Sequence, residues 1–191
     1  MDPSIAWKAP LTFSFSGLGL YGPSGGLFLV AALVGAAGRS MKLGTPATTK
    51  PFDSIPSFYP FYLTQHTERF TKVLHVLGTG CTLAAVAKQP RLGVALLAAV
   101  AGGSAASPYF RRFESGAGEA FFAVTAYVAC GRSLGVPAVY LAGAPATAYF
   151  FAWISHAFFE KNKPATFIYP TYSLLCDFLM CADIFCGRVH L

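Results

Sequence analysis

Long apolar runs alternate with short polar stretches over the C-terminal two thirds of the chain. The runs cover residues 73–87, 92–107, 120–131, 136–159 and 168–186. They are rich in Ala and Gly, as are membrane helices that pack closely against one another. Several are shorter than the roughly 20 residues that cross a bilayer. Because so few segments do not close a membrane barrel, we predict an all-α, multi-pass helical membrane bundle of about 4–6 membrane-embedded helices.

The N-terminal part of the chain has a different pattern. Residues 26–38 are apolar but short, and we expect a marginal membrane span or an interfacial helix there. Residues 39–57 are polar and rich in Pro and Thr, which is typical of a linker. We therefore expect an N-terminal extension over 1–55. A membrane-embedded domain would follow over 56–187, with an additional helical segment at about 89–135.

Composition supports a membrane location. Of the 191 residues, 54% are hydrophobic and only 12% are charged, whereas ordinary soluble domains carry about 25% charged residues. The net charge of +6 comes from basic residues scattered between the apolar runs, as is typical of the flanks of membrane segments. These features exclude a typical soluble enzyme, and we expect no nucleic-acid partner.

Three of the four histidines lie at the edges of apolar runs. They are His66, His75 and His156, whereas His190 lies beside the C-terminus. Ionisable residues close to membrane segments are costly and usually functional. His66 and His75 are nine positions apart, about half a turn out of phase on one straight helix. They converge only if the chain breaks between them, and the polar residues 67–72 permit such a break.

A second group lies at the end of the longest run. His156 and Glu160 are four positions apart and share one helix face. If the two middle runs both cross the membrane, or neither does, this group meets His66 and His75 on the same side. Imidazole suits Zn, Cu, Fe and Ni, and two His with a carboxylate are typical of non-haem Fe(II) oxygenases. The residues alone leave two interpretations open, a metal site or hydrogen-bonded histidines at the membrane interface.

Acidic residues add one further candidate. Asp177 lies within the last apolar run, where it is either functional or paired with Lys161, Lys163 or a backbone group near the interface. Glu114 and Glu119 flank a Gly-rich loop, and we expect both to be solvated.

Two blocks of sequence resemble a known family. The first contains PSFYPFYLTQH and VLHVLGTG, and the second is AYFFAWISHAFFEKNKPATFIYPTYSLLCDF. The second is the more specific, because of its His-x3-Glu-Lys-Asn-x-Pro-Ala-Thr-Phe motif. Both resemble the small membrane proteins of the 2-hydroxy fatty acid dioxygenase family. Its fungal member resides in the endoplasmic reticulum and shortens 2-hydroxy fatty acids by one carbon during phytosphingosine breakdown.

The resemblance implies an Fe(II)-dependent dioxygenase of fatty acid α-oxidation, which cleaves a 2-hydroxy fatty acid to a chain one carbon shorter. Its partners would be the lipid bilayer, the 2-hydroxy fatty acid and dioxygen. Matched by motif, the catalytic metal ligands would be His66, His75 and His156, with Glu160 as a fourth ligand or a group that supports the ligands. The residues expected to bind substrate are Lys161, Lys163, Trp153 and Tyr149. Asp177 would support a metal ligand.

The chain departs from the family pattern in three places. Only Lys72 stands where members often carry an Arg-rich stretch, the segment at about 89–135 contains no matching motif, and the N-terminal 50 residues are extra. We favour the dioxygenase, and these departures leave open an alternative function, a non-catalytic accessory or structural subunit of a larger membrane complex that retains the fold. A lipid-binding or transport module is a third hypothesis. The family implies the endoplasmic reticulum, with the mitochondrial inner membrane as the alternative location.

Overall fold

The computed structural model describes residues 50–191, so the predicted segment at 26–38 and most of the expected N-terminal extension lie outside the described residues. The described part is built of helices, which confirms the all-α prediction for this range. The helices are α3 (Ile55–Thr64), α4 (Arg69–Lys88), α5 (Pro90–Phe110), α6 (Ala117–Ser133), α7 (Ala138–Ser155), the π-helix η1 (His156–Glu160), the short 3-10 helix η2 (Ala165–Phe167) and α8 (Pro170–Phe185).

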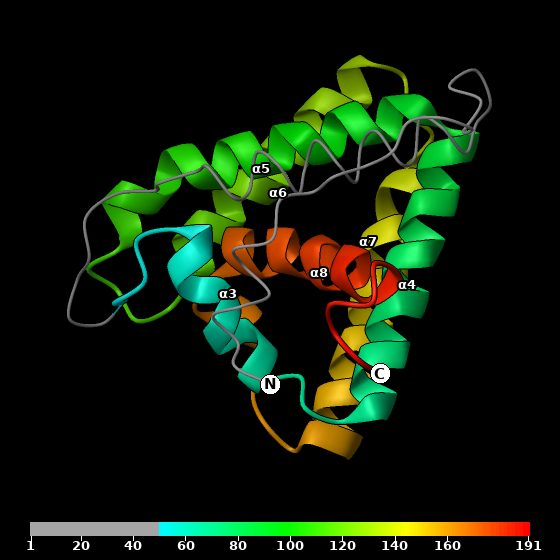
Figure 1. Cartoon of the computed structure of the whole chain (residues 1–191). Coiled ribbons are helices and arrows are strands. Elements are labelled where there is room, and N and C mark those ends of the chain that lie inside the picture. The colour runs from blue at the N-terminus through cyan, green and yellow to red at the C-terminus, as the bar shows by residue number, and fades with distance from the viewer. Residues whose placement is uncertain (1–49) are drawn as a thin grey trace.

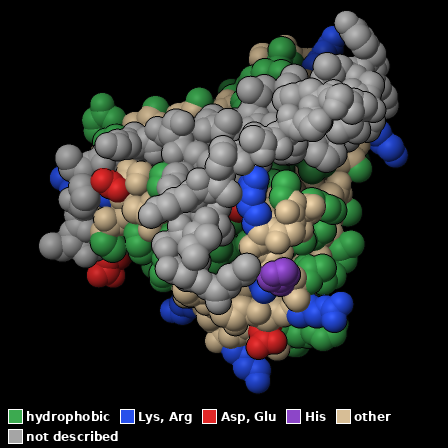
Figure 2. Space-filling view, in the orientation of Figure 1, with side chains coloured by type: hydrophobic (Ala, Val, Ile, Leu, Met, Phe, Trp, Pro, Cys, Tyr) green, Lys and Arg blue, Asp and Glu red, His purple; other side chains and the backbone are tan. Residues whose placement is uncertain are grey.

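Three of the described helices are long and apolar enough to cross a membrane. They are Arg69–Lys88, Pro90–Phe110 and Ala138–Glu160. The helices α6 and α8 are shorter, with 17 and 16 residues. Exposed Leu77, Val94 and Phe150 lie on the three candidate spans. Figure 2 shows hydrophobic side chains along the margin that α4 occupies, between Lys and Arg side chains near its two ends. The chain is therefore an integral membrane protein.

The first described helix begins inside the segment expected to be a linker. Ser54 caps α3, because its hydroxyl accepts from the backbone N–H of Ser57 and the Ser57 hydroxyl accepts from the N–H of Ser54. Pro56 in the first turn favours helix as well. The linker prediction was therefore wrong for residues 55–57.

The long helices associate in two pairs. In Figure 1, α4 and α7 lie side by side, and the paired α5 and α6 cross one end of them. Small residues permit both close approaches. A Cβ at Gly78 would lie 3.3 Å from the carbonyl oxygen of Ala148. A Cβ at Gly102 would lie 2.7 Å from the Cβ of Ala126 and 2.9 Å from the carbonyl oxygen of Phe122. The abundance of Gly and Ala thus reflects contacts between helix backbones.

Aromatic side chains join α3 to α8. The ring of Phe58 lies 4.9 Å from that of Tyr169 and 5.5 Å from that of Tyr172, measured between centroids. Phe58, Tyr59 and Tyr62 on α3 are buried in this cluster. Aromatic burial of this extent anchors the short α3 beside α8, and it fixes the loop that follows α3.

One acidic residue contradicts the expectation of solvation. Glu114 is exposed, but Glu119 is only 3% exposed. The Glu119 carboxylate accepts a hydrogen bond from the backbone N–H of Thr171 at 3.0 Å. Because Thr171 lies in the first turn of α8, this anion satisfies a free N–H group at the positive end of the helix.

Candidate metal centre

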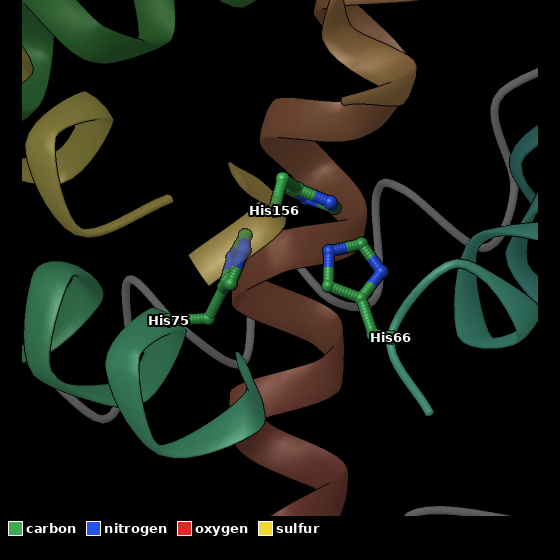
Figure 3. Close-up of side chains that lie close together, drawn as sticks. All are labelled: His66, His75 and His156. Atoms are coloured by element: carbon green, nitrogen blue, oxygen red, sulfur yellow. The ribbon is translucent and has the colours of Figure 1, made fainter. Parts of the chain in front are cut away.

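Three histidines from separate segments converge beside α8. His66 lies in the loop after α3, His75 lies on α4, and His156 is the first residue of η1 (Figure 3). The potential ligand atoms of these residues all lie within 4.8 Å of one another. The three residues are almost inaccessible, with exposed fractions of 1%, 5% and 2%. The fold therefore brings the three histidines together at one buried position.

The convergence depends on a chain break between His66 and His75. Helix α3 ends at Thr64 and α4 begins at Arg69. No side chain of α4 caps its own N-terminus. Instead, the Glu160 carboxylate accepts from the backbone N–H of Glu68 at 2.7 Å and from the hydroxyl of Thr67 at 3.1 Å. This contact fixes the start of α4 against the end of η1.

The rings of His66 and His75 are oriented through their Nδ1 atoms. Nδ1 of His66 donates to the carbonyl oxygen of Tyr62 at 2.7 Å, and the His66 ring stacks on the Tyr62 ring. Nδ1 of His75 donates to a carboxylate oxygen of Asp177 at 2.9 Å. Oxygen acceptors at Nδ1 leave the Nε2 lone pair of a neutral imidazole free to bind a metal. Asp177 thus contacts His75, and not Lys161 or Lys163.

His156 is oriented by a sharp turn in the chain. Lys161 ends η1 in the left-handed conformation, with a φ of 54°, and the turn carries Asn162 back toward η1. The side-chain oxygen of Asn162 then accepts from Nδ1 of His156 at 2.6 Å. The amide nitrogen of Asn162 donates to the carbonyl oxygen of Gln65 at 3.2 Å. Asn162 therefore links His156 to the loop that carries His66.

The remaining ring nitrogens have the properties of metal ligands. The Nε2 atoms of His66 and His75 are buried and have no hydrogen-bond partner, which is uncommon for a buried polar atom. Burial, and next the neighbouring His75, hold the pKa of His66 well below its usual value, so its ring stays neutral near pH 7. A neutral imidazole is the form that binds transition metals.

The distances between the potential ligand atoms extend slightly beyond those that one bound ion requires. Two nitrogens that bind one ion at about 2.1 Å lie at most about 4.2 Å apart. Small rotations of the imidazole rings would shorten the distance between ligand atoms from 4.8 Å to this limit. The donor set therefore fits a transition metal such as Fe or Zn.

Glu160 is placed beside this group and not within it. Both of its carboxylate oxygens accept hydrogen bonds from residues 67 and 68. Lys161 and Lys163 are exposed and do not line the cavity described next. His156 therefore belongs to the histidine group, whereas Glu160, Lys161 and Lys163 lie outside it.

An apolar cavity of about 160 Å³ adjoins the three histidines. Its wall includes Asp177 and small or aromatic residues of α6 and α7. Tyr149 and Trp153 line the cavity with their ring centroids 5.7 Å apart. Both residues were expected to bind substrate, and the structure places them next to the histidines.

Sequence reasoning missed two groups that orient the histidines. One is the carbonyl oxygen of Tyr62, four positions before His66. The other is the side chain of Asn162. Asn162 belongs to the His-x3-Glu-Lys-Asn motif, so the motif contained the signal, but no spacing rule connects a histidine with a residue six positions later across a turn.

Comparison with known proteins agrees with this geometry. The model of the family described as "2-hydroxy-palmitic acid dioxygenase Mpo1-like" matches residues 52–189 and includes the segment at 89–135. Searches of the curated proteins and of the solved structures returned no significant match. The family match covers well over half of the chain, including all three histidines and the residues that orient them. The chain belongs to the 2-hydroxy-palmitic acid dioxygenase Mpo1-like family.

Proposed function

We propose that this protein is an Fe(II)-dependent dioxygenase that shortens 2-hydroxy fatty acids by one carbon. The observation that carries the proposal is the set of three buried imidazoles whose Nδ1 atoms are occupied, with unpartnered Nε2 atoms on His66 and His75. The family match supports the substrate class. The apolar cavity beside the histidines supports a ligand with a hydrocarbon chain.

In this proposal His66, His75 and His156 hold the iron. A bound Fe(II) would supply positions for dioxygen and for the hydroxyl and carboxylate of the substrate. The protein residues orient these ligands. Asp177 holds the ring of His75 and Asn162 holds that of His156, and such supporting hydrogen bonds fix both ring direction and ligand basicity.

The cavity would hold the part of the acyl chain next to the head group. Its wall runs from His156, at the start of η1, along α7 to Ala144, which is about 18 Å along a helix axis. The wall is mainly apolar, with aromatic rings at Tyr149 and Trp153. Such a wall excludes water from the reacting end and favours a hydrocarbon chain over a polar substrate.

The proposed reaction consumes one dioxygen for each substrate. The bond between carbons 1 and 2 breaks, carbon 2 becomes the carboxyl of the shortened acid, and carbon 1 leaves as carbon dioxide with one water. Dioxygen takes up the four electrons that the two carbons lose. Burial of the three histidines keeps bulk water from the site during this oxidation.

The site lies at a depth that suits a lipid with a polar head. His75 is six residues from Arg69, and His156 is four residues from Glu160, so both are within about 10 Å of the polar helix ends. The head group would then lie near the membrane surface and the chain would point into the hydrocarbon layer. We propose the endoplasmic reticulum membrane as its location, because the family resemblance implies this compartment.

The first experiment is to measure iron in protein purified anaerobically in detergent. We expect about one iron per chain, as one three-histidine site predicts, and loss of iron and of turnover in His66→Ala, His75→Ala and His156→Ala. His190→Ala is the matched control, because His190 is exposed and lies outside the group.

Absence of iron after anaerobic loading with Fe(II) would contradict the proposal. It would favour the non-catalytic subunit, which should then purify together with its partner proteins. Iron retained in any one of the three alanine variants would show that the replaced histidine is not a ligand.

A further inference from the structure

The most exposed part of the cavity wall beside the histidines lies on two facing helices. Among the described residues that line it, three are more than about a third exposed, namely Val124, Tyr149 and Trp153, with exposed fractions of 60%, 40% and 52%. Val124 lies on α6, and Tyr149 and Trp153 lie one turn apart on α7. The cavity therefore opens between α6 and α7.

The packing of the helices explains why this seam is open. Helix α6 packs on α5, as the short approach of Gly102 to Ala126 shows, and α7 packs on α4 through Gly78 and Ala148. Each of the facing helices thus has its close partner elsewhere. Small side chains then line the seam, among them Ala123 on α6 and Ala152 on α7, and these leave space instead of filling it.

The opening lies deep within a candidate membrane span. Tyr149 is eleven residues from both Ala138 and Glu160, the ends of that span, which corresponds to about 16 Å of helix on either side. Large exposed hydrophobic side chains flank the opening, Phe121 on α6 and Phe150 on α7. An opening at this depth with this rim faces hydrocarbon and not water.

We propose that the substrate of the proposed dioxygenase reaches the histidines sideways from the bilayer, through the opening between Val124 and the Tyr149–Trp153 pair. This inference rests on the proposed function for the identity of the substrate. The occupant of the opening is a single acyl chain, whose head group lies at the histidines while its far end extends among the lipid chains. Because one cavity connects the opening with the histidines, no helix has to separate from another for this route.

The two tryptophans of the chain allow a direct test without turnover. The chain contains only Trp7 and Trp153, so Trp7→Phe leaves one fluorophore, at the opening. In vesicles of phosphatidylcholine brominated near the middle of its chains, we expect quenching of Trp153. A saturating long-chain 2-hydroxy acid without bromine should then relieve part of that quenching, because its chain displaces the lipid. Unquenched Trp153 fluorescence in these vesicles would overturn the proposal.

A pair of substitutions on α6 tests the route by kinetics. Val124→Phe narrows the opening, whereas Val128→Phe adds the same bulk one turn away, at an exposed position that does not line the cavity. For a long-chain 2-hydroxy acid supplied in vesicles, we expect Val124→Phe to lower kcat/KM about tenfold. Val128→Phe should leave it unchanged. Equal effects of the two substitutions would contradict a route through this opening.

A short water-soluble substrate separates failure of the route from failure of the proposed function. Val124→Phe should slow turnover of 2-hydroxyhexanoate less than turnover of the long-chain acid, since the short chain fills less of the narrowed opening. If neither acid is turned over and iron is absent, the proposed function fails. If both acids are turned over and Val124→Phe slows neither of them, the function stands and the lateral route is wrong.

Discussion

Asp177 and His75 lie 102 positions apart in the sequence, yet the Asp177 carboxylate accepts from Nδ1 of His75 at 2.9 Å. The side chain of His75 is 4% exposed, while that of Asp177 is 22% exposed. The contact joins α8 to α4 and directs Nε2 of His75 toward the other two histidines. The orientation of one proposed ligand therefore depends on a helix that contributes no ligand.

Asp177→Asn should weaken metal binding. The amide still accepts from Nδ1, but it lacks the charge that raises the basicity of the imidazole, so we expect affinity to fall about 10–100-fold. Metal titration of the metal-free protein measures this effect. Glu114→Gln is the control, because Glu114 is exposed. Equal affinity in Asp177→Asn and the control would show that the carboxylate does not support the site.

Glu160→Ala should destabilise the protein without removing a ligand. The substitution removes the acceptor for the N–H of Glu68 and an anion at the N-terminus of α4, a loss of about 1 kcal/mol. Thermal unfolding in detergent measures the loss, with Glu114→Ala as the control. Iron per chain at saturating Fe(II) should be unchanged. A folded Glu160→Ala variant that holds no iron would instead identify Glu160 as a fourth ligand.

Gly78→Leu should separate α4 from α7. A Cβ at Gly78 already lies 3.3 Å from the carbonyl oxygen of Ala148, and a larger side chain costs about 1–3 kcal/mol. Because Gly78 is one turn from His75, we expect weaker metal binding as well as a lower unfolding temperature. Gly80→Leu is a close control, since nothing lies within 4 Å of a Cβ there. Similar losses in both variants would show that the close approach of Gly78 to Ala148 is not responsible.

Acid should destabilise the metal-free protein through His66. Burial holds the pKa of His66 well below 6.5 in the folded state, while the unfolded chain titrates near about 6.5. Above that pH the His66 side chain is neutral in both the folded and the unfolded state, and the free energy of unfolding has its full value. Below it only the unfolded state gains the proton, so stability falls by up to about 1.4 kcal/mol per pH unit.

The unfolding temperature between pH 7.5 and pH 5 tests the role of His66 in this acid response. His66→Gln should reduce the dependence on pH, whereas His190→Gln, at an exposed position, should leave it unaltered. An identical pH response in the protein with and without His66 would contradict the expected role of this side chain.

Much of the fold follows from the sequence, but the helix ends do not. The apolar run at 73–87 predicts α4, which in fact begins at Arg69. Its first turn is polar, so hydropathy does not report it, and its cap comes from Glu160, more than ninety positions away. Helix α3 was missed because its signals are a Ser54–Ser57 capping box and aromatic burial instead of a long apolar run.

The candidate site was predictable in its histidines and not in its supporting contacts. His66, His75 and His156 stand out because ionisable residues are rare beside apolar runs. The partners of their Nδ1 atoms depend on tertiary structure, since Asp177 arrives on another helix and Asn162 arrives through the left-handed turn at Lys161. Local patterns contain no information on such contacts.

The wide sequence separation of the three histidines has a consequence for biosynthesis. His66 and His75 are synthesised early, but His156 follows His66 only after ninety further positions, and Asn162 and Asp177 come later still. A growing chain therefore has no complete ligand set until α7 and α8 have been made and have packed against α4. If the site binds iron as proposed, iron loading would be a late event that stabilises only the finished fold, and cells short of iron should accumulate a full-length but more easily degraded protein.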